Sequence, residues 1–409
     1  MKTTEKKHTI PVIDKKYILP FVLVTVLFLL WGLANNMTDT LLAAFRKIMK
    51  MNDTQTSLIQ LAFYGAYFCI ALPAALFIRR YSFKSGVILG LALYATGAIL
   101  FFPAAVVASY AFYLFAIYVM ACGCSVLETT ANPYIMSMGS PETATRRLNI
   151  AQSFNPIGSI VGILMSKYFI LQDVSLFSIS GTYMTLGGVL LMILIVMLFA
   201  KMPQGHSPKL EEKLTSVFGR LLRNRNYLYG VIAQFFYVGA QIGVWSFTIR
   251  IVMQELNVNE SDASSIYLIS IIGFCSSRFV YTWLMKYYQP AKLLVFSGVV
   301  SSIFALIVAV SAGTGWVLVV TLMLVSVFMS MMFPTIYGLA LESVVNSPSP
   351  EDAKIGASGL IMSILGGALL TPLQGMVSDH SNIYMSFLVP CGCFVIVLLY
   401  ALYYLKKEN

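Results

Sequence analysis

The stretch FVLVTVLFLLWGLANNMTD (residues 21–39) is apolar enough to cross a lipid bilayer, yet it ends on a carboxylate, Asp39. A helix needs about 20 predominantly apolar residues to span the hydrocarbon core. A charged side chain at the centre of such a helix costs about 2.5–3.5 kcal/mol on insertion scales. A second acid, Glu128, lies in the equally apolar stretch CGCSVLETTANP (residues 122–133). Both acids are therefore expected to face the protein interior or a water-filled path, where moving a proton or a polar solute would explain them.

The composition of the whole chain agrees with these two stretches. It is 58% hydrophobic and 11% charged, with a mean hydropathy of +0.80, whereas soluble proteins are about 25% charged. The sequence therefore predicts an all-α membrane protein with twelve transmembrane helices. The expected spans are 18–45, 55–78, 85–103, 107–137, 148–171, 179–200, 227–254, 263–285, 293–312, 315–341, 354–377 and 383–405.

The distribution of lysine and arginine predicts the orientation. If both termini are cytoplasmic, nearly all basic residues outside the spans fall on the inner side, and the outer side keeps only Arg46, Lys47, Lys50 and Lys167. This is the positive-inside pattern. The net charge of +10 is thus a topology signal and no sign of nucleic-acid binding. We expect a monomeric multi-pass protein that contacts lipid in a bacterial inner membrane.

A polar segment at residues 201–216 divides the chain near its midpoint. Similar local patterns in the two parts, such as AsnPro at 132–133 and PhePro at 333–334, argue for a duplicated six-helix unit. Two such repeats with a solute site at their interface describe the major facilitator architecture. The predicted organisation is a cytoplasmic tail (1–17), a six-helix half (18–200), a cytoplasmic linker (201–226), a second six-helix half (227–405) and a cytoplasmic tail (406–409).

Polar side chains inside the spans suggest the chemistry of the solute. The first half offers Asp39, Glu128 and amides, and the second half offers aromatic residues, amides and two arginines. Amides bridge neighbouring hydroxyls and carboxylates accept strong hydrogen bonds from them, so this set suits a neutral, hydroxyl-rich solute. The candidate residues beside the two acids are Trp31, Asn35, Asn36, Asn132, Gln152, Asn155, Gln234, Tyr237, Gln241, Trp245, Arg250, Arg278 and Gln374.

Each candidate also has a purely structural interpretation. Amides within spans often bond between helices, and Trp31 or Trp245 could belong to the core or to the interfacial belt. Arg278 could pair with a neighbour or a backbone carbonyl. The six cysteines are best explained as small buried side chains, and we expect no metal site, no cofactor and no enzyme, because no nucleophile–base pair, metal cluster or phosphate-binding loop occurs.

Six motifs resemble the fucose permease family of major facilitator sugar–proton symporters. They are WGLANNMTD (31–39), LETTANP (127–133), AQSFN (151–155), AQFFYVGAQ (233–241), FPTIY (333–337) and TPLQGMVSD (371–379). The resemblance covers nearly the whole chain in the same order. It implies that Asp39 and Glu128 are the functional carboxylates and that Asn36, Gln152 and Asn155 line the sugar cavity. This chain departs from fucose-transporting members at Thr38, where they carry Asn, and at Phe333, where they carry Tyr.

The leading hypothesis is a proton-coupled symporter for L-fucose or a related monosaccharide, working by alternating access with the proton as coupling ion. Asp39 and Glu128 are the proton-coupling candidates. The substrate-binding candidates are Trp31, Asn36, Glu128, Gln152, Asn155, Gln241 and Phe333. The alternatives are a glucose/galactose-type hexose transporter, an uncoupled facilitator and a membrane sugar sensor that does not transport.

Overall fold

The computed structural model describes residues 11–49, 53–170, 175–202, 212–345 and 351–408. Within these ranges the side chains of residues 35, 38–47, 53–57, 60, 167, 260–261, 345 and 408 are not described. In the described part of the chain, twelve helical segments are long and apolar enough to cross a membrane. The predicted number of spans is confirmed.

Six of these spans precede residue 201 and form the first half of the molecule. Short 3₁₀ or π turns, η1 (Lys15–Tyr17), η2 (Pro141–Thr143) and η3 (Ser166–Ile170), adjoin its helices. The helices are α1 (Ile18–Met49), α2 (Asp53–Arg80), α3 (Phe83–Ile99), α4 (Phe101–Val107), α5 (Tyr110–Met136), α6 (Ala144–Gln152), α7 (Asn155–Met165) and α8 (Leu176–Phe199).

The other six spans form the second half, which also contains the turns η4 (Ser363–Leu365) and η5 (Met385–Phe387). Its helices are α10 (Arg225–Leu256), α11 (Glu260–Leu284), α12 (Pro290–Val310), α13 (Trp316–Met329), α14 (Met332–Val345), α15 (Glu351–Met362), α16 (Gly366–His380) and α17 (Leu388–Glu408). A short helix, α9 (Leu214–Arg223), lies in the predicted linker and buries Val217 and Leu221. The linker segment is therefore partly folded onto the bundle, since α9 packs against α15.

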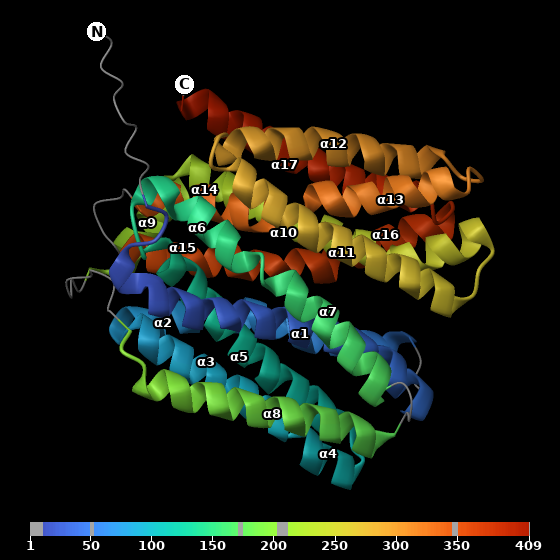
Figure 1. The fold of residues 1–409 in the computed structure, drawn as a ribbon, viewed down its shortest axis with the longest axis horizontal. Coiled ribbons are helices and arrows are strands. Elements are labelled where there is room, and N and C mark those ends of the chain that lie inside the picture. Colours follow the sequence, from blue (N-terminus) through green and yellow to red (C-terminus); the bar gives the residue numbers. More distant parts are fainter. Residues whose placement is uncertain (1–10, 50–52, 171–174, 203–211, 346–350, 409) are drawn as a thin grey trace.

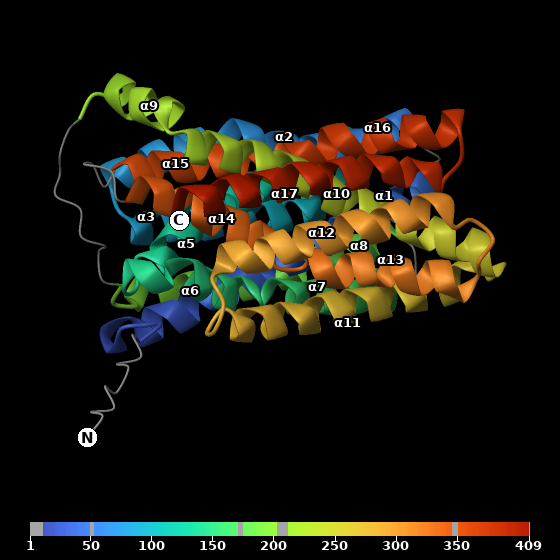
Figure 2. The ribbon, with the colours of Figure 1, turned by 90° about the horizontal axis from the view of Figure 1, so that it is seen from above.

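The turn η1 before the first helix and the last turn of α17 lie at the same end of an elongated helical bundle, on the left of Figure 1. We call this the terminal end. In that view most of the first half forms the lower part of the bundle and most of the second half the upper part, while α6 of the first half lies beside α14. Figure 2 shows α9 beside α15 at the terminal end. The outer surface is apolar, with large exposed side chains such as Phe115, Met192, Phe199, Val310 and Leu399, as expected of a surface that faces lipid.

Four spans expected to be continuous helices are interrupted, the first of them, 85–103, between α3 and α4. The span 148–171 breaks between α6 and α7, 315–341 breaks between α13 and α14, and 354–377 breaks at η4. For the break between α6 and α7 the cause is local, because Pro156 in the first turn of α7 has no N–H to continue a preceding helix. Interrupted spans of this kind are tolerated where the backbone is buried in protein. Here the breaks separate the terminal-end part of each span from the rest.

Glycines allow two pairs of helices to approach closely, one pair in each half. A Cβ on Gly158 would lie 1.8 Å from the backbone oxygen of Leu29 in α1, and a Cβ on Gly366 would lie 2.0 Å from that of Phe235 in α10. The fifth span therefore packs closely on the first, and the eleventh packs closely on the seventh. The two seams occupy equivalent places in the halves, as a duplicated unit requires.

Candidate functional site

Glu128 lies on α5 with 9% of its side-chain surface exposed. Among the described residues it forms no hydrogen bond and no ion pair. Its electrostatic neighbours are weak acids or polar groups: Cys124 on the same helix, Tyr67 on α2, and Tyr337 from the second half. An acid so placed has none of the partners that usually compensate a buried charge.

One turn along α5, Asn132 is fully buried and accepts a hydrogen bond from Gln152. The distance from Gln152 Nε2 to Asn132 Oδ1 is 3.0 Å. The structure therefore brings Glu128 and Gln152 into one cluster, joined through Asn132. The Nδ2 group of Asn132 is buried and has no hydrogen-bond partner among the described residues.

Three other predicted residues lie along α1 and the start of α7. Trp31 is 2% exposed, and its ring centroid lies 4.9 Å from that of Phe28. Asn36 donates to the Gly32 oxygen at 3.2 Å. Asn155 donates to the Phe28 oxygen, also at 3.2 Å, which ties α7 to α1. Trp31 is thus buried in this conformation, and its Nε1 group has no hydrogen-bond partner among the described residues and adjoins Tyr67.

Asp39 belongs to α1 by its backbone, but its side chain lies outside the described residues. Its role stays a prediction.

In the second half, Gln241 of α10 and Phe333 of α14 are both half-buried. The Phe333 ring lies 6.4 Å from that of Tyr237, whose hydroxyl donates to the Met329 oxygen at 3.1 Å. Gln241 forms no hydrogen bond within the described part of the chain. Neither residue is joined to the Glu128 cluster by a described contact, so their role in binding stays a prediction.

Arg278 of α11 connects the two halves. It is 3% exposed and donates to the oxygen of Gln152 at 2.8 Å and to the oxygen of Ser330 at 2.7 Å. Its guanidinium carbon lies 4.8 Å from the centroid of the Phe274 ring. Pairing with backbone carbonyls, one of the structural interpretations of this residue, is confirmed.

Further contacts between the halves lie towards the terminal end. Glu342 of α14 accepts from the backbone nitrogen of Thr145 at 3.0 Å and from its hydroxyl at 2.5 Å. Asn149 of α6 donates to the hydroxyl of Thr335 at 3.3 Å. Gly338 makes this approach possible, because a Cβ there would lie 2.4 Å from Thr145 Oγ1.

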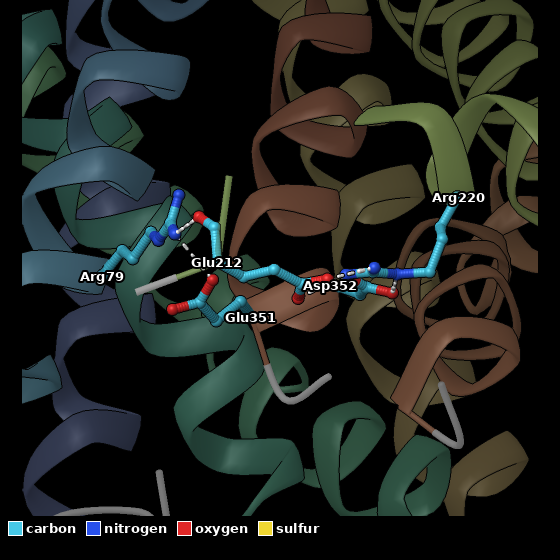
Figure 3. A network of polar contacts seen from close by, with 5 residues as sticks. All are labelled: Arg79, Glu212, Arg220, Glu351 and Asp352. Carbon is cyan, nitrogen blue, oxygen red and sulfur yellow. Dashed lines mark hydrogen bonds and ion pairs between the residues drawn. The ribbon is translucent and has the colours of Figure 1, made fainter. Parts of the chain in front are cut away.

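At the terminal end itself, four charged residues of α2, α9 and α15 form one network with Glu212, which lies two residues before α9 (Figure 3). Arg79 pairs with Glu351 at 2.8 Å and also donates to the backbone oxygen of Glu212. Arg220 bonds both carboxylate oxygens of Asp352 and both of Glu212. The network therefore joins the first half, the linker and the second half.

The cysteines form no disulfide among the described residues, and all six are free. The prediction that they are buried holds for Cys122, Cys124, Cys275 and Cys393, whereas Cys391 is half-buried. For Cys69 the prediction is wrong, because its position on α2 faces the outer surface of the bundle. No group of residues able to hold a metal occurs in the described part of the chain.

Sequence reasoning missed Tyr67 and Tyr337 as members of the Glu128 cluster. Tyr337 belongs to the FPTIY motif, so the motif itself was the available signal. Tyr67 lies in an apolar stretch without neighbouring polar residues, and only the packing of α2 on α5 reveals its position.

Comparison with known proteins agrees with the fold. The family model described as "Major Facilitator Superfamily" matches residues 22–364. The chain belongs to the Major Facilitator Superfamily. Several relatives of this major facilitator match it over almost its entire length, so the resemblance to the fucose permease family is confirmed as well.

One relative is the "L-fucose-proton symporter" of Haemophilus influenzae, which is 40% identical over 95% of this chain and 97% of its own. The "Glucose/galactose transporter" of Brucella abortus is 32% identical over 98% and 97%, respectively. Among solved structures, the transporter FucP "in the outward conformation" superimposes with a TM-score of 0.85 at 33% identity, covering 95% of this chain and 99% of that one. These relatives are named as transporters and not as enzymes.

Proposed function

We propose that this major facilitator is a proton-coupled sugar symporter with L-fucose as its first substrate. The observation that carries the proposal is the environment of Glu128. It is an acid inside a spanning helix, nearly buried, without a cation or hydrogen-bond partner among the described residues, and one turn from the amide pair Asn132–Gln152. Burial without a cation favours the neutral form of a carboxyl group, which is the form that carries a proton across a membrane.

The similarity to relatives named L-fucose-proton symporters supports fucose as first substrate. The relatives named glucose/galactose transporters keep a hexose as the second candidate. Asp39 and Glu128 are the proposed proton-coupling residues, with the proton as the only coupling partner. Trp31, Asn36, Gln152, Asn155, Gln241 and Phe333 are the proposed sugar contacts.

Alternating access supplies the mechanism. The contacts of Arg278, Glu342 and the charged network hold the halves together towards the terminal end. The positive-inside pattern assigns that end to the cytoplasm of a bacterial inner membrane. In this arrangement the site would exchange sugar and protons with the outside, and opening of the terminal end would release both inward. We propose that a monomer in lipid suffices.

The test is uptake of radiolabelled L-fucose, glucose, galactose and mannose into proteoliposomes, with and without an imposed pH gradient. Sugar added to de-energised vesicles should alkalinise the external medium. Uptake without alkalinisation would indicate a facilitator, and binding without any flux would indicate a sensor. Either result would end the symport proposal.

Substitutions of the two acids test whether each takes part in proton coupling. Asp39→Asn should abolish proton-driven accumulation and retain sugar exchange. Glu128→Gln should abolish accumulation and weaken binding. Glu255→Gln is the matched control, because Glu255 lies near the end of α10 and accepts from the backbone nitrogens of Gly313 and Gly315. Accumulation by either acid variant at the level of the control would remove that acid from the mechanism.

A further inference from the structure

Tyr337 is a second-half residue whose hydroxyl lies at the first-half polar cluster. Its side chain is fully buried, and its Oη atom has no hydrogen-bond partner among the described residues. The hydroxyl nevertheless adjoins the Asn132 amide and lies within electrostatic range of Glu128. A buried polar group without a partner lowers stability; what distinguishes this hydroxyl from other buried ones is its place beside Asn132 and Glu128 of the other half.

The neighbouring amide has a complementary unused group. Asn132 Oδ1 is already occupied as the acceptor of Gln152 Nε2. Its Nδ2 group, by contrast, is buried and without a partner among the described residues. The Asn132 donor from the first half and the Tyr337 hydroxyl from the second half thus lie side by side, near enough to interact weakly with each other, while neither forms a full hydrogen bond with a described residue.

We propose that Asn132 Nδ2 and Tyr337 Oη together bind one hydroxyl group of the transported sugar. A sugar hydroxyl both accepts and donates a hydrogen bond. It can therefore accept from Asn132 and donate to Tyr337, satisfying both groups at once. This inference rests on the proposed sugar transport and deepens it, because it names a contact made by the second half.

The subsite also gives a physical reason for selectivity. A site built to hydrogen-bond a hydroxyl rejects an analogue that lacks it, since the buried partners are then left unpaired. Because the two groups come from different halves, a sugar that occupies the subsite also links the halves. An analogue without the relevant hydroxyl should bind more weakly and should support less transport.

The test pairs residue variants with deoxy sugars. Purified wild type and Tyr337→Phe are titrated by calorimetry with L-fucose and with its 2-deoxy, 3-deoxy and 4-deoxy derivatives. Tyr337→Phe should bind L-fucose about tenfold more weakly, as expected for the loss of one hydrogen bond in a buried site. Wild type should bind one of the deoxy derivatives more weakly than it binds L-fucose. In Tyr337→Phe this difference in affinity should largely disappear, because the deoxy sugar and the variant each remove the same hydrogen bond.

The matched control is Tyr400→Phe. Tyr400 is likewise buried with an unpartnered hydroxyl, but it lies on α17 within the second half, next to Gly230. Tyr400→Phe should leave the affinity for L-fucose, and the loss of affinity for each deoxy derivative, as in wild type. Both variants should melt at or above the wild-type temperature, because each removes a buried hydroxyl that has no partner.

The possible outcomes separate the two proposals. Unchanged L-fucose affinity in Tyr337→Phe, or an equal weakening towards all four sugars, would overturn the subsite. If wild type binds another hexose of the panel in place of L-fucose, the same series is run with the deoxy derivatives of that hexose. If wild type binds and transports none of them, the symport proposal fails and the subsite falls with it.

Discussion

The guanidinium of Arg220 in α9 donates two hydrogen bonds, of 2.8 Å and 2.7 Å, to the carboxylate of Asp352 in α15. The carboxylate is 1% exposed and the guanidinium side chain is 30% exposed. On its other side Arg220 bonds Glu212, whose backbone oxygen accepts from Arg79 of the first half. The linker therefore acts as a strap across the terminal end, anchored in both halves.

Removal of Arg220 should weaken this strap. Arg220→Ala removes two charge-assisted hydrogen bonds to the buried Asp352 carboxylate, which we expect to lower the free energy of unfolding by about 1–3 kcal/mol. Arg223→Ala is the matched control, because Arg223 lies on the same short helix and is exposed. Thermal unfolding in detergent measures both, and equal effects of the two substitutions would contradict the strap.

The stability that the Arg220–Asp352 pair contributes should depend on salt concentration but not on pH near neutrality. The hydrogen bonds to Asp352, and then to Glu212, raise the pKa of Arg220 further above its ordinary value. The contribution of a raised pKa is complete below the unfolded pKa and is lost only as the pH rises through the folded one. Between about pH 6 and about pH 9 the guanidinium thus stays charged. The stability difference between wild type and Arg220→Ala should be constant across that range and should shrink in about 1 M salt.

Gly338 should control how closely the halves approach at the terminal end. In Gly338→Ala the added Cβ would lie only 2.4 Å from Thr145 Oγ1. This contact is too short, so the substitution should push α14 away from α6. The expected result is a longer distance between spin labels on Arg80 and Lys292, measured by pulsed electron resonance. Gly392→Ala is the control, because a Cβ at Gly392 meets nothing within 4 Å. An unchanged distance distribution in Gly338→Ala would contradict the prediction that the added methyl group separates α14 from α6.

The two glycine seams should be equally intolerant of a methyl group. In Gly158→Ala and Gly366→Ala the added Cβ would lie 1.8 Å and 2.0 Å from a backbone oxygen. Backbone cannot move as a side-chain tip can, so each change should cost about 1–3 kcal/mol of stability. Gly188→Ala serves as the control within α8, where a Cβ meets nothing within 4 Å and helix propensity favours alanine. Melting temperatures of the three variants test the seams directly.

The sequence was sufficient to predict the twelve spans, because hydropathy over about 20 residues is a strong signal. It also located Glu128 and Gln152, since a polar side chain in a span is conspicuous. It did not predict the breaks beside Pro156 or before Met332, because proline is tolerated within spanning helices: Pro73 and Pro133 lie inside unbroken ones. It could not reveal that Tyr337 reaches the first half, because that contact depends on how the two halves pack against each other.

Arg278 should set the strength of closure between the halves. Its planar guanidinium donates simultaneously to the backbone oxygen of Gln152 in the first half and to that of Ser330 in the second half. Lysine carries the same charge but presents it as a point, so Arg278→Lys should lose one of these two charge-assisted bonds. A loss of about 1.5–3 kcal/mol changes the ratio of closed to open terminal ends about tenfold or more. The spin-label distances described for Gly338 measure that ratio. Arg250→Lys is the control, because Arg250 is exposed and lies over the Phe247 ring. If both lysine variants kept the wild-type distribution, Arg278 would be a packing residue and no clamp between the halves.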